Sequence, residues 1–242
     1  MISKNQIKLI TSLHQKKYRQ VHRLFIAEGE KVIAEFLASN YDLEYLFVTD
    51  YATIFDTIDL KNSISVADLS KISCLSTPNN CLAVFKMPAV KPVSTTGLKL
   101  VLDGVQDPGN FGTIIRLCDW FGIADLVCST NTVDLYNPKV VQATMGSMAR
   151  VDVNYCNIAT YIEKSELPVF GTFMEGKNIY KQQLPENAIL ILGNEGNGIT
   201  DEIEKLVTYK IAIPRFGALQ KTESLNVASA AAIFLSEFKR NS

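Results

Sequence analysis

Apolar and polar residues follow one another at two different spacings along the chain. In the first 90 residues, the apolar side chains Ile7, Ile10, Leu13 and Tyr18 recur at helical spacing and predict a long first helix over residues 3–21. Short apolar runs between helical segments predict strands. The further elements predicted in this half are a strand and turn over 24–29, helices over 30–38 and 67–73, and strands over 43–49, 63–66 and 82–85.

After residue 98 the chain alternates regularly between short apolar strands and helices. Strands are predicted over 99–103, 125–128, 168–173, 188–192 and 209–213, and helices over 111–121, 138–148 and 225–238. Strands that are apolar at nearly every position are typical of a mainly parallel sheet covered on both faces. The pattern therefore predicts an α/β fold whose ligands bind beyond the carboxyl ends of the strands.

The two halves are separated by a segment with no periodicity. Residues 87–97 contain two prolines and several small polar side chains, which is typical of a linker. We therefore predict a first domain over residues 1–90, a linker over 91–97 and a second domain over 98–242.

Composition narrows the class of protein. Of 242 residues, 47% are hydrophobic and 20% are charged, which supports a sizeable core and excludes a disordered or fibrous chain. There is no apolar run of membrane-spanning length and no secretory signal at the N-terminus, so we expect a cytoplasmic protein without a membrane partner. The five cysteines are odd in number and never spaced C-x-x-C, which argues against a disulfide framework or a zinc site and favours burial.

Positive charge is concentrated at one end of the chain. The net charge is −1, which by itself argues against a nucleic-acid-binding protein, yet residues 1–31 hold seven Lys and Arg residues against two Glu. Two interpretations remain open, an exposed face of an amphipathic helix or a patch that contacts phosphate groups.

Three segments of the second half combine polar residues with glycine or proline at the end of a predicted strand. In the first, residues 103–116, a helix begins near Asn110 and carries Arg116 nearly two turns later. An ordinary capped helix with a surface arginine is the structural alternative.

The second segment, residues 191–199, has three glycines in six positions, which indicates a backbone that approaches something closely. It matches neither the P-loop nor the dinucleotide-binding pattern. Its acidic residue, Glu195, would repel a phosphate, so a ligand with hydrogen-bond donors or positive charge fits better.

The third segment, residues 211–228, contains Ser224, which could cap the following helix, and Asn226, which would then lie in the first turn and contact something. Both histidines, His14 and His22, lie in the other half, so a Ser-His-Asp triad within the α/β half is excluded. We find no spacing typical of metal ligands.

In this order, the three segments resemble the motifs of the SpoU (TrmH) family of RNA 2′-O-methyltransferases, which belongs to the SPOUT class. The matching positions are Asn110, Gly112 and Arg116, then residues 192–196 with Gly198, then residues 213–214 and 224–228, together with residues 136–141 and Gly146. The first half resembles the family's smaller substrate-binding domain, which is L30e-like, through residues 25–32 and 43–48.

The resemblance implies a trefoil-knotted methyltransferase domain, a homodimer and S-adenosyl-L-methionine as cofactor. The implied cofactor-binding residues are Leu192, Gly193, Asn194, Gly196, Ile213, Pro214 and Leu225. The implied catalytic residues are Asn110, Arg116, Glu195, Ser224 and Asn226. Residues 218–222 make the loop before Ser224 longer than the family pattern leads us to expect, and this loop should border the cofactor pocket.

The expected reaction is methylation of a ribose 2′-hydroxyl. Because arginine is not deprotonated in proteins, we expect Arg116 to orient the hydroxyl and stabilise developing negative charge, with Glu195 positioning Arg116 or a substrate group. The two-domain layout favours ribosomal over transfer RNA, and Lys16, Lys17, Arg19 and Arg23 become the predicted RNA contacts.

Two alternatives come from other functional classes. A non-catalytic RNA-binding or ribosome-assembly factor could use the same fold, but the presence of all five predicted catalytic residues argues against it. A nucleotide-binding oxidoreductase lacks support because the dinucleotide-binding pattern is missing.

Overall fold

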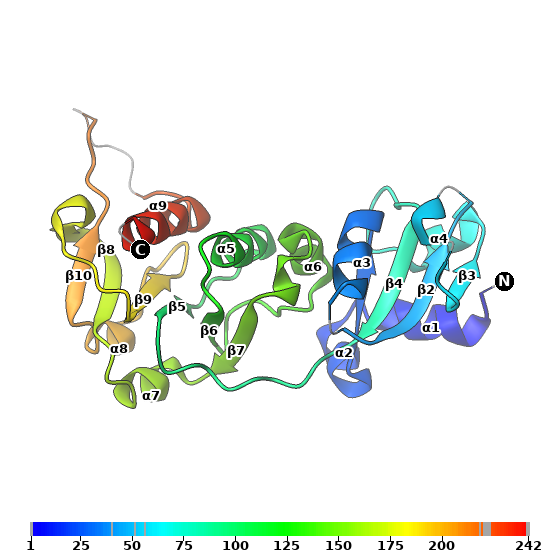
Figure 1. The fold of residues 1–242 in the computed structure, drawn as a ribbon, viewed down its shortest axis with the longest axis horizontal. Helices are drawn as coiled ribbons and strands as arrows, with labels where there is room; N and C mark the ends of the chain where they lie inside the picture. The colour runs from blue at the N-terminus through cyan, green and yellow to red at the C-terminus, as the bar shows by residue number, and fades with distance from the viewer. Residues whose placement is uncertain are drawn as a thin grey trace. The chain divides into compact units, whose positions relative to one another are not determined.

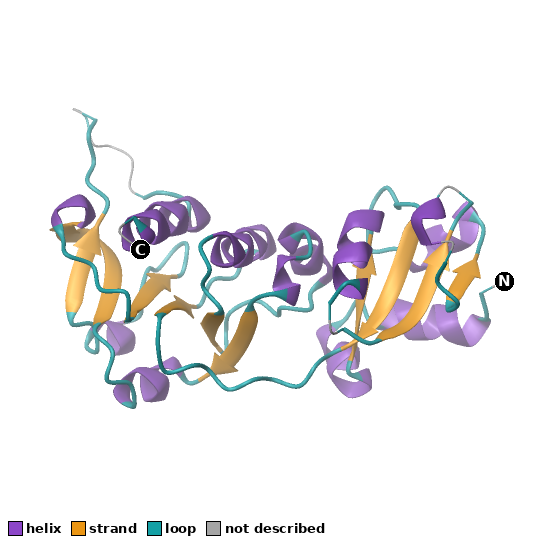
Figure 2. Cartoon of the chain, in the orientation of Figure 1, coloured by secondary structure: helices purple, strands orange, loops and turns teal. Residues whose placement is uncertain are grey.

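The computed structural model describes residues 2–39, 41–50, 52–55, 57–217, 219 and 224–240. Its contacts divide the chain into two compact units. The first unit comprises Met1–Ala89 and Asp134–Ala149, and the second comprises Val90–Val133 and Arg150–Ser242. Figure 1 follows the chain through its elements, and Figure 2 separates helices from strands.

The first unit is built on a four-stranded mixed sheet with the order β1-β4-β2-β3. Strand β4 is antiparallel to both of its neighbours, and β3 is parallel to β2. The strands are β1 (Leu24–Glu28), β2 (Leu43–Val48), β3 (Lys61–Ser63) and β4 (Cys81–Lys86). The helices are α1 (Lys4–Ser12), α2 (Lys16–His22), α3 (Glu30–Leu37), α4 (Val66–Ile72) and α6 (Pro138–Thr144), with short 3₁₀ turns η1 (Thr53–Phe55) and η2 (Ser147–Ala149).

Alternating side chains of β1 point into two different cores, as the period of a strand requires. Leu24 and Ile26 join a cluster with residues of α1 and α4. Phe25 lies on the opposite face, where its ring packs against Phe36 of α3 and against Tyr136 at a centroid distance of 4.8 Å. The sheet is therefore covered on both faces.

The prediction of one helix over residues 3–21 is wrong, because α1 ends at Ser12 and α2 begins at Lys16. Arg19 satisfies backbone carbonyls at this break. Its guanidinium donates to the carbonyl oxygens of Leu13 at 2.8 Å and His14 at 2.9 Å, and it forms an ion pair with Asp134 at 2.5 Å. A partner far along the chain thus stabilises an interruption that helical periodicity does not reveal.

Residues 134–149 belong to the first unit, although the sequence-based division assigned them to the second half. Three contacts hold them there besides the Arg19–Asp134 pair. Tyr136 packs on Phe25, Tyr41 donates to the carbonyl oxygen of Met148, and Gly146 passes so close to Glu35 that a Cβ atom at this glycine would lie 2.5 Å from the Cβ of Glu35. The chain therefore leaves the second unit after Val133, contributes residues 134–149 to the first unit, and re-enters the second unit at Arg150.

The second unit contains a six-stranded sheet in which every pair is parallel, as predicted. The order β10-β8-β9-β5-β6-β7 is formed by β5 (Leu98–Asp103), β6 (Asp125–Ser129), β7 (Asp152–Cys156), β8 (Val169–Asn178), β9 (Ala188–Gly193) and β10 (Tyr209–Ala212). The helices are α5 (Pro108–Trp120), α7 (Ile158–Glu163), α8 (Asp201–Glu204) and α9 (Val227–Lys239), with one 3₁₀ turn, η3 (Ile179–Lys181).

Helices cover both faces of this sheet. Helices α5 and α9 pack together on one face, and α7 and α8 lie on the other (Figure 1). The sequence patterns missed β7, α7 and α8. Strand β7 is an edge strand with mostly half-buried positions, so it has no continuous apolar run.

No helix in the described part of the chain is both long enough and apolar enough to cross a membrane.

The strand order reverses beside β5. The chain continues from β5 to β6 and β7, crosses to β8, and returns to β9 on the other side of β5. In open parallel sheets, ligands bind at such a reversal, beyond the carboxyl ends of the strands. Asp103 and Gly193, at the ends of β5 and β9, are directly paired there.

We expect Arg19→Ala to lower the free energy of unfolding by about 3–5 kcal/mol, because it leaves Asp134 without its partner and carbonyl oxygens unsatisfied. Denaturant unfolding followed by circular dichroism measures this change. Lys17→Ala, an exposed position of the same helix, is the control and should change stability by less than about 0.5 kcal/mol. Equal effects of the two substitutions would contradict a structural role for Arg19.

Candidate functional site

The loop that follows β9 folds tightly onto itself. The backbones of Asn194 and Gly198 exchange two hydrogen bonds of 2.9 Å, and the side chain of Asn194 accepts from the N–H of Gly196. A Cβ atom on Gly193 would lie 2.1 Å from the carbonyl carbon of Gly198. The close approach expected from the glycine pattern is thus an approach of the loop to its own backbone.

Glu195 joins this loop to the one that leads from β5 into α5. Its carboxylate accepts a hydrogen bond of 3.1 Å from the side chain of Asn110 and bonds of 3.3 Å from the N–H groups of Gln106 and Asp107. Beside it, Asn194 donates to the carbonyl oxygen of Gly104 at 2.7 Å. Two segments that the sequence singled out separately are therefore in contact.

These bonds also govern the charge of Glu195. Burial alone raises the pKa of its carboxyl, but hydrogen bonds from Asn110 and from its own and neighbouring backbone N–H groups outweigh that effect and lower the pKa below its usual value. Glu195 is therefore ionised at neutral pH and acts as a hydrogen-bond acceptor.

Asn226 continues this arrangement from the third segment. Its amide nitrogen donates to the side-chain oxygen of Asn110 at 2.8 Å, while its own oxygen accepts from the N–H groups of Ala228 and Ser229 at the start of α9. Asn226 is thus the N-cap of α9, and the prediction that Ser224 caps this helix is wrong. An amide suits the position because it can accept from the helix and donate to Asn110 at once.

The structure does not place Arg116 and Ser224 in this hydrogen-bonded chain. Arg116 is exposed on α5 and forms no hydrogen bond or ion pair with the residues that the structure describes. The oxygens of Glu195 face Asn110 and the backbone, so the expected contact between Glu195 and Arg116 is not present. Ser224 is also exposed and lies at the wall of the cavity described next.

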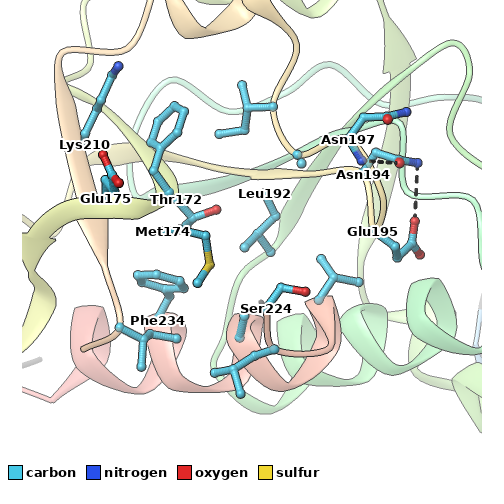
Figure 3. Close-up of a pocket in the computed structure, with 18 of the residues that line it drawn as sticks. Thr172, Met174, Glu175, Leu192, Asn194, Glu195, Asn197, Lys210, Ser224 and Phe234 are labelled. Atoms are coloured by element: carbon cyan, nitrogen blue, oxygen red, sulfur yellow. Dashed lines mark hydrogen bonds between the residues drawn. The ribbon is translucent and has the colours of Figure 1, made fainter. Parts of the chain in front are cut away.

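A cavity of about 1050 Å³ opens beside the middle of β8 and the carboxyl ends of β9 and β10, next to α9. This volume lies at the upper end of the range for small-molecule sites. All seven residues predicted to bind a cofactor line it: Leu192, Gly193, Asn194, Gly196, Ile213, Pro214 and Leu225. Figure 3 shows Leu192, Met174 and Phe234 between Asn194 and Glu195 at one end and Glu175 and Lys210 at the other.

Sequence reasoning missed part of the cavity wall. Thr172, Met174 and Glu175 belong to β8, which continues to Asn178 rather than ending near residue 173 as predicted. These residues lie between Gly171 and Gly176, and the mixed polar and apolar pattern after residue 171 could have extended the strand. Phe234 was interpreted as part of an apolar helix face, and its contribution to the wall depends on the packing of α9.

Acidic side chains outnumber basic ones around the cavity. Glu175, Glu195, Asp201 and Glu204 line it, against Lys210 and Arg215, and Lys210 is paired with Glu204. This balance suits a ligand that carries positive charge, as expected from the position of Glu195 in the sequence. In the long loop before Ser224, residues 218 and 220–223 lie outside the described residues.

The predicted RNA contacts separate into two kinds. Lys16, Lys17 and Arg23 are exposed on or next to α2. Arg19 is 2% exposed, and its guanidinium is engaged by Asp134 and two backbone carbonyls. The prediction of Arg19 as an RNA contact therefore does not agree with the structure, because its charge is already used inside the first unit.

The model of the SpoU rRNA methylase family matches residues 97–236, more than half of the chain. This chain belongs to the SpoU rRNA methylase family. The family match contains all three segments of the site, and a model of the MRM3-like substrate-binding domain matches residues 4–83 within the first unit.

Individual relatives of this SpoU-family chain are similar over nearly its whole length. It is 34% identical to the 23S rRNA (guanosine(2553)-2′-O)-methyltransferase RlmP of Bacillus subtilis, over 96% of each chain. A structure from Porphyromonas gingivalis, assigned to the TrmH family of RNA methyltransferases, is 40% identical and superposes over all of both chains with a TM-score of 0.90. An AdoMet-bound rRNA methyltransferase from Sinorhizobium meliloti is 26% identical, with a TM-score of 0.87 over 99% of this chain and 97% of that one.

We expect Gly193→Ala in this SpoU-family chain to lower the free energy of unfolding by about 1–3 kcal/mol, because the added methyl group would overlap the backbone at Gly198. Thermal or denaturant unfolding measures the loss. Gly217→Ala is the matched control, since nothing lies within 4 Å of the added atom there. A Gly193→Ala protein as stable as the Gly217→Ala protein would contradict the tight loop.

Proposed function

We propose that this chain is an S-adenosylmethionine-dependent RNA methyltransferase that modifies a ribose 2′-hydroxyl of ribosomal RNA. The observation that carries the proposal is the hydrogen-bonded chain Glu195–Asn110–Asn226 beside a cavity lined by all seven predicted cofactor residues. Membership of the SpoU rRNA methylase family supports the reaction. The B. subtilis relative, named as a 23S rRNA 2′-O-methyltransferase, supports the class of RNA.

The cavity suits S-adenosylmethionine in its charge, its lining and its backbone geometry. The excess of acidic side chains favours a cationic ligand, and Leu192, Ile213 and Phe234 offer apolar surface to a flat aromatic base. A Cβ atom at Gly196 would meet only the side-chain oxygen of Asn194, at 3.6 Å, so this glycine leaves the backbone of the cavity wall open to close approach. When bound, the cofactor supplies a methyl group attached to positively charged sulfur. The AdoMet-bound S. meliloti structure supports this assignment.

The residues of the hydrogen-bonded chain have separate roles in this proposal. Glu195 holds the side chain of Asn110, and Asn110 holds Asn226 at the start of α9, so the polar groups are positioned before substrate arrives. Arg116 lies on the same helix as Asn110 and has no partner among the described residues. Since arginine stays protonated, Arg116 orients the 2′-hydroxyl and stabilises the negative charge that develops on its oxygen. Ser224, at the cavity wall, completes the polar surroundings.

We also propose the topology of the two units, the oligomeric state and the cellular location of the protein. The second unit would be a trefoil-knotted SPOUT domain, the first an L30e-like RNA-binding domain, and the active form a cytoplasmic homodimer. The MRM3-like substrate-binding match over residues 4–83 supports an RNA-binding role for the first domain, with residues 98–242 carrying out methyl transfer. Lys16, Lys17 and Arg23 are the proposed phosphate contacts of the first unit, because all three are exposed.

The deciding experiment supplies methyl-labelled S-adenosylmethionine with ribosomal and transfer RNA that lack the modification. Alkaline hydrolysis follows, because a 2′-O-methyl group blocks cleavage at its own position. We expect label in alkali-stable dinucleotides from the ribosomal fraction. Label in the transfer RNA fraction alone would show that the substrate is transfer RNA and not ribosomal RNA. RNA binding without label in either fraction would favour the non-catalytic RNA-binding factor.

In the same assay, Arg116→Ala should reduce turnover by at least about 10²–10³-fold, because the developing negative charge loses its stabilising group. Cofactor affinity, measured by equilibrium dialysis, should stay within a few-fold, since Arg116 does not line the cavity. Lys164→Ala removes the same charge from the end of α7, on the opposite face of the sheet, and should leave both quantities unchanged. Loss of cofactor binding in Arg116→Ala would contradict the assigned role.

Replacing Lys16, Lys17 and Arg23 together by Gln should weaken RNA binding and flatten its dependence on salt. The slope of log Kd against log salt concentration should fall by about 0.7–0.9 for each phosphate group that the protein no longer neutralises. The triple replacement of Lys164, Lys181 and Lys205 by Gln removes the same charge from exposed positions of the second unit and is the control. A salt slope that changes equally in both triple variants would place the RNA-binding surface elsewhere.

A further inference from the structure

Asp103, the last residue of β5, carries a buried carboxyl group that the proposed reaction does not use. The residue is 4% exposed and forms no ion pair with any residue that the structure describes. Burying a carboxylate without a cation is costly, so its hydrogen bonds must compensate. Both hydrogen bonds come from one residue, because a single oxygen of Asp103 accepts from the N–H and from the hydroxyl of Thr200, each at 2.8 Å.

The hydroxyl of Thr200 departs from the usual behaviour of its position. Thr200 is the N-cap of α8, and an N-cap hydroxyl normally accepts a hydrogen bond from the first turn of its own helix. Here the side chain forms no such bond, and its hydroxyl donates to Asp103 instead. The side chain therefore fastens the start of α8 to the end of β5.

Asp103 holds both ends of the loop that follows β9. At the beginning of the loop, Gly193 is paired with Asp103 in the parallel register of β9 and β5. At the end of the loop, Thr200 is bound to the carboxylate of the same residue. Between these two points, Asn194 donates to the carbonyl oxygen of Gly104 at 2.7 Å. Two consecutive residues after the middle of β5 thus fix the loop at three points.

The second of these residues is itself held by the neighbouring strand. The N–H of Gly104 donates to the hydroxyl of Ser129, at the end of β6, at 2.9 Å. The same hydroxyl is bonded to that of Thr132 at 3.0 Å, and both side chains are buried. The loop is therefore attached to groups that belong to the interior of the second unit.

The loop forms one wall of the cavity, whereas the residues that hold its ends do not line it. Every residue from 193 to 199 contributes to the cavity wall. Asp103 and Thr200 are absent from this wall. A substitution at either residue can therefore affect a molecule in the cavity only through the shape of the loop.

We propose that Asp103 is a positioning residue for S-adenosylmethionine, which it serves by holding Thr200 and so keeping the loop that follows β9 in the shape that receives the cofactor. A binding loop that is ordered in advance loses less conformational freedom when its ligand arrives, so the hydrogen bonds of Asp103 raise the affinity. This inference rests on the proposed function, because it assigns a residue that acts on the cofactor of that reaction.

Thr200→Val is the smallest change that tests this role, since valine has the shape of threonine without the hydroxyl. Equilibrium dialysis with methyl-labelled S-adenosylmethionine should show binding weakened by about 10-fold, the lower end of the effect of a hydrogen bond to a charged group. Thr200→Ser keeps the hydroxyl and should bind like the wild type. Thr49→Val removes a hydroxyl that is bonded to the carbonyl oxygen of Asn80 in the first unit, and this matched control should leave the affinity unchanged.

Two further measurements separate positioning from a general loss of stability. Asp103→Ala should weaken binding more than Thr200→Val, and the double variant should bind no more weakly than Asp103→Ala, because the bond is already lost. In the ligand-free protein, amide hydrogen exchange over residues 193–200 should be faster in Thr200→Val and unchanged in the first unit. Thr200→Val carries the test alone if Asp103→Ala does not fold.

Binding by Thr200→Val as tight as that of the wild type would overturn the inference. Equal weakening by Thr200→Ser or by Thr49→Val would also overturn it, since the first keeps the hydroxyl and the second lies in the other unit. A wild-type protein that binds no S-adenosylmethionine would refute the proposed function. Amide exchange over residues 193–200 that is equal in the wild type and in Thr200→Val would refute the role of Asp103 separately, because that measurement needs no cofactor.

Discussion

The ionised carboxylate of Glu195 is the group on which the arrangement of the site depends. It accepts hydrogen bonds from the side chain of Asn110 and from two backbone N–H groups in the loop before α5. Hydrogen bonds to a charged acceptor are stronger than those between neutral groups, and here they join loops that follow two neighbouring strands. The start of α5 and the wall of the cavity therefore keep a fixed relation to each other.

Glu195 belongs both to the cavity and to the hydrogen-bonded chain. One side of its loop contributes Gly193, Asn194 and Gly196 to the cavity wall, while its carboxylate holds Asn110 and through it Asn226. A molecule that settles in the cavity must contact the same loop that orients these polar side chains. In a methyltransferase this arrangement would couple the position of the cofactor to that of the groups that face the ribose.

Two of the arginines that the sequence singled out, Arg19 and Arg116, have opposite environments. Arg19 and Arg116 both lie in helices, and helical periodicity does not reveal which of the two has a buried partner. Arg19 is buried because Asp134, 115 positions away, is packed against it in the first unit. Arg116 is exposed without a partner among the described residues. The contacts of Arg19 therefore stabilise the fold, whereas Arg116 is available for the proposed reaction.

Local sequence by itself determined the parallel sheet and the three polar segments at strand ends, because wholly apolar strands and glycine-rich turns are local properties. The residues of the cavity wall in those segments were implied by the resemblance of the three segments to the SpoU family. The tertiary structure alone decided that Asn226 caps α9, that the first helix is broken, that residues 134–149 join the first unit, and that β8 supplies Met174 and Glu175 to the cavity. Each of these depends on a partner distant in the chain. Periodicity reports which side of an element is buried, whereas the partner that satisfies a given hydrogen-bonding group is set by how the elements pack.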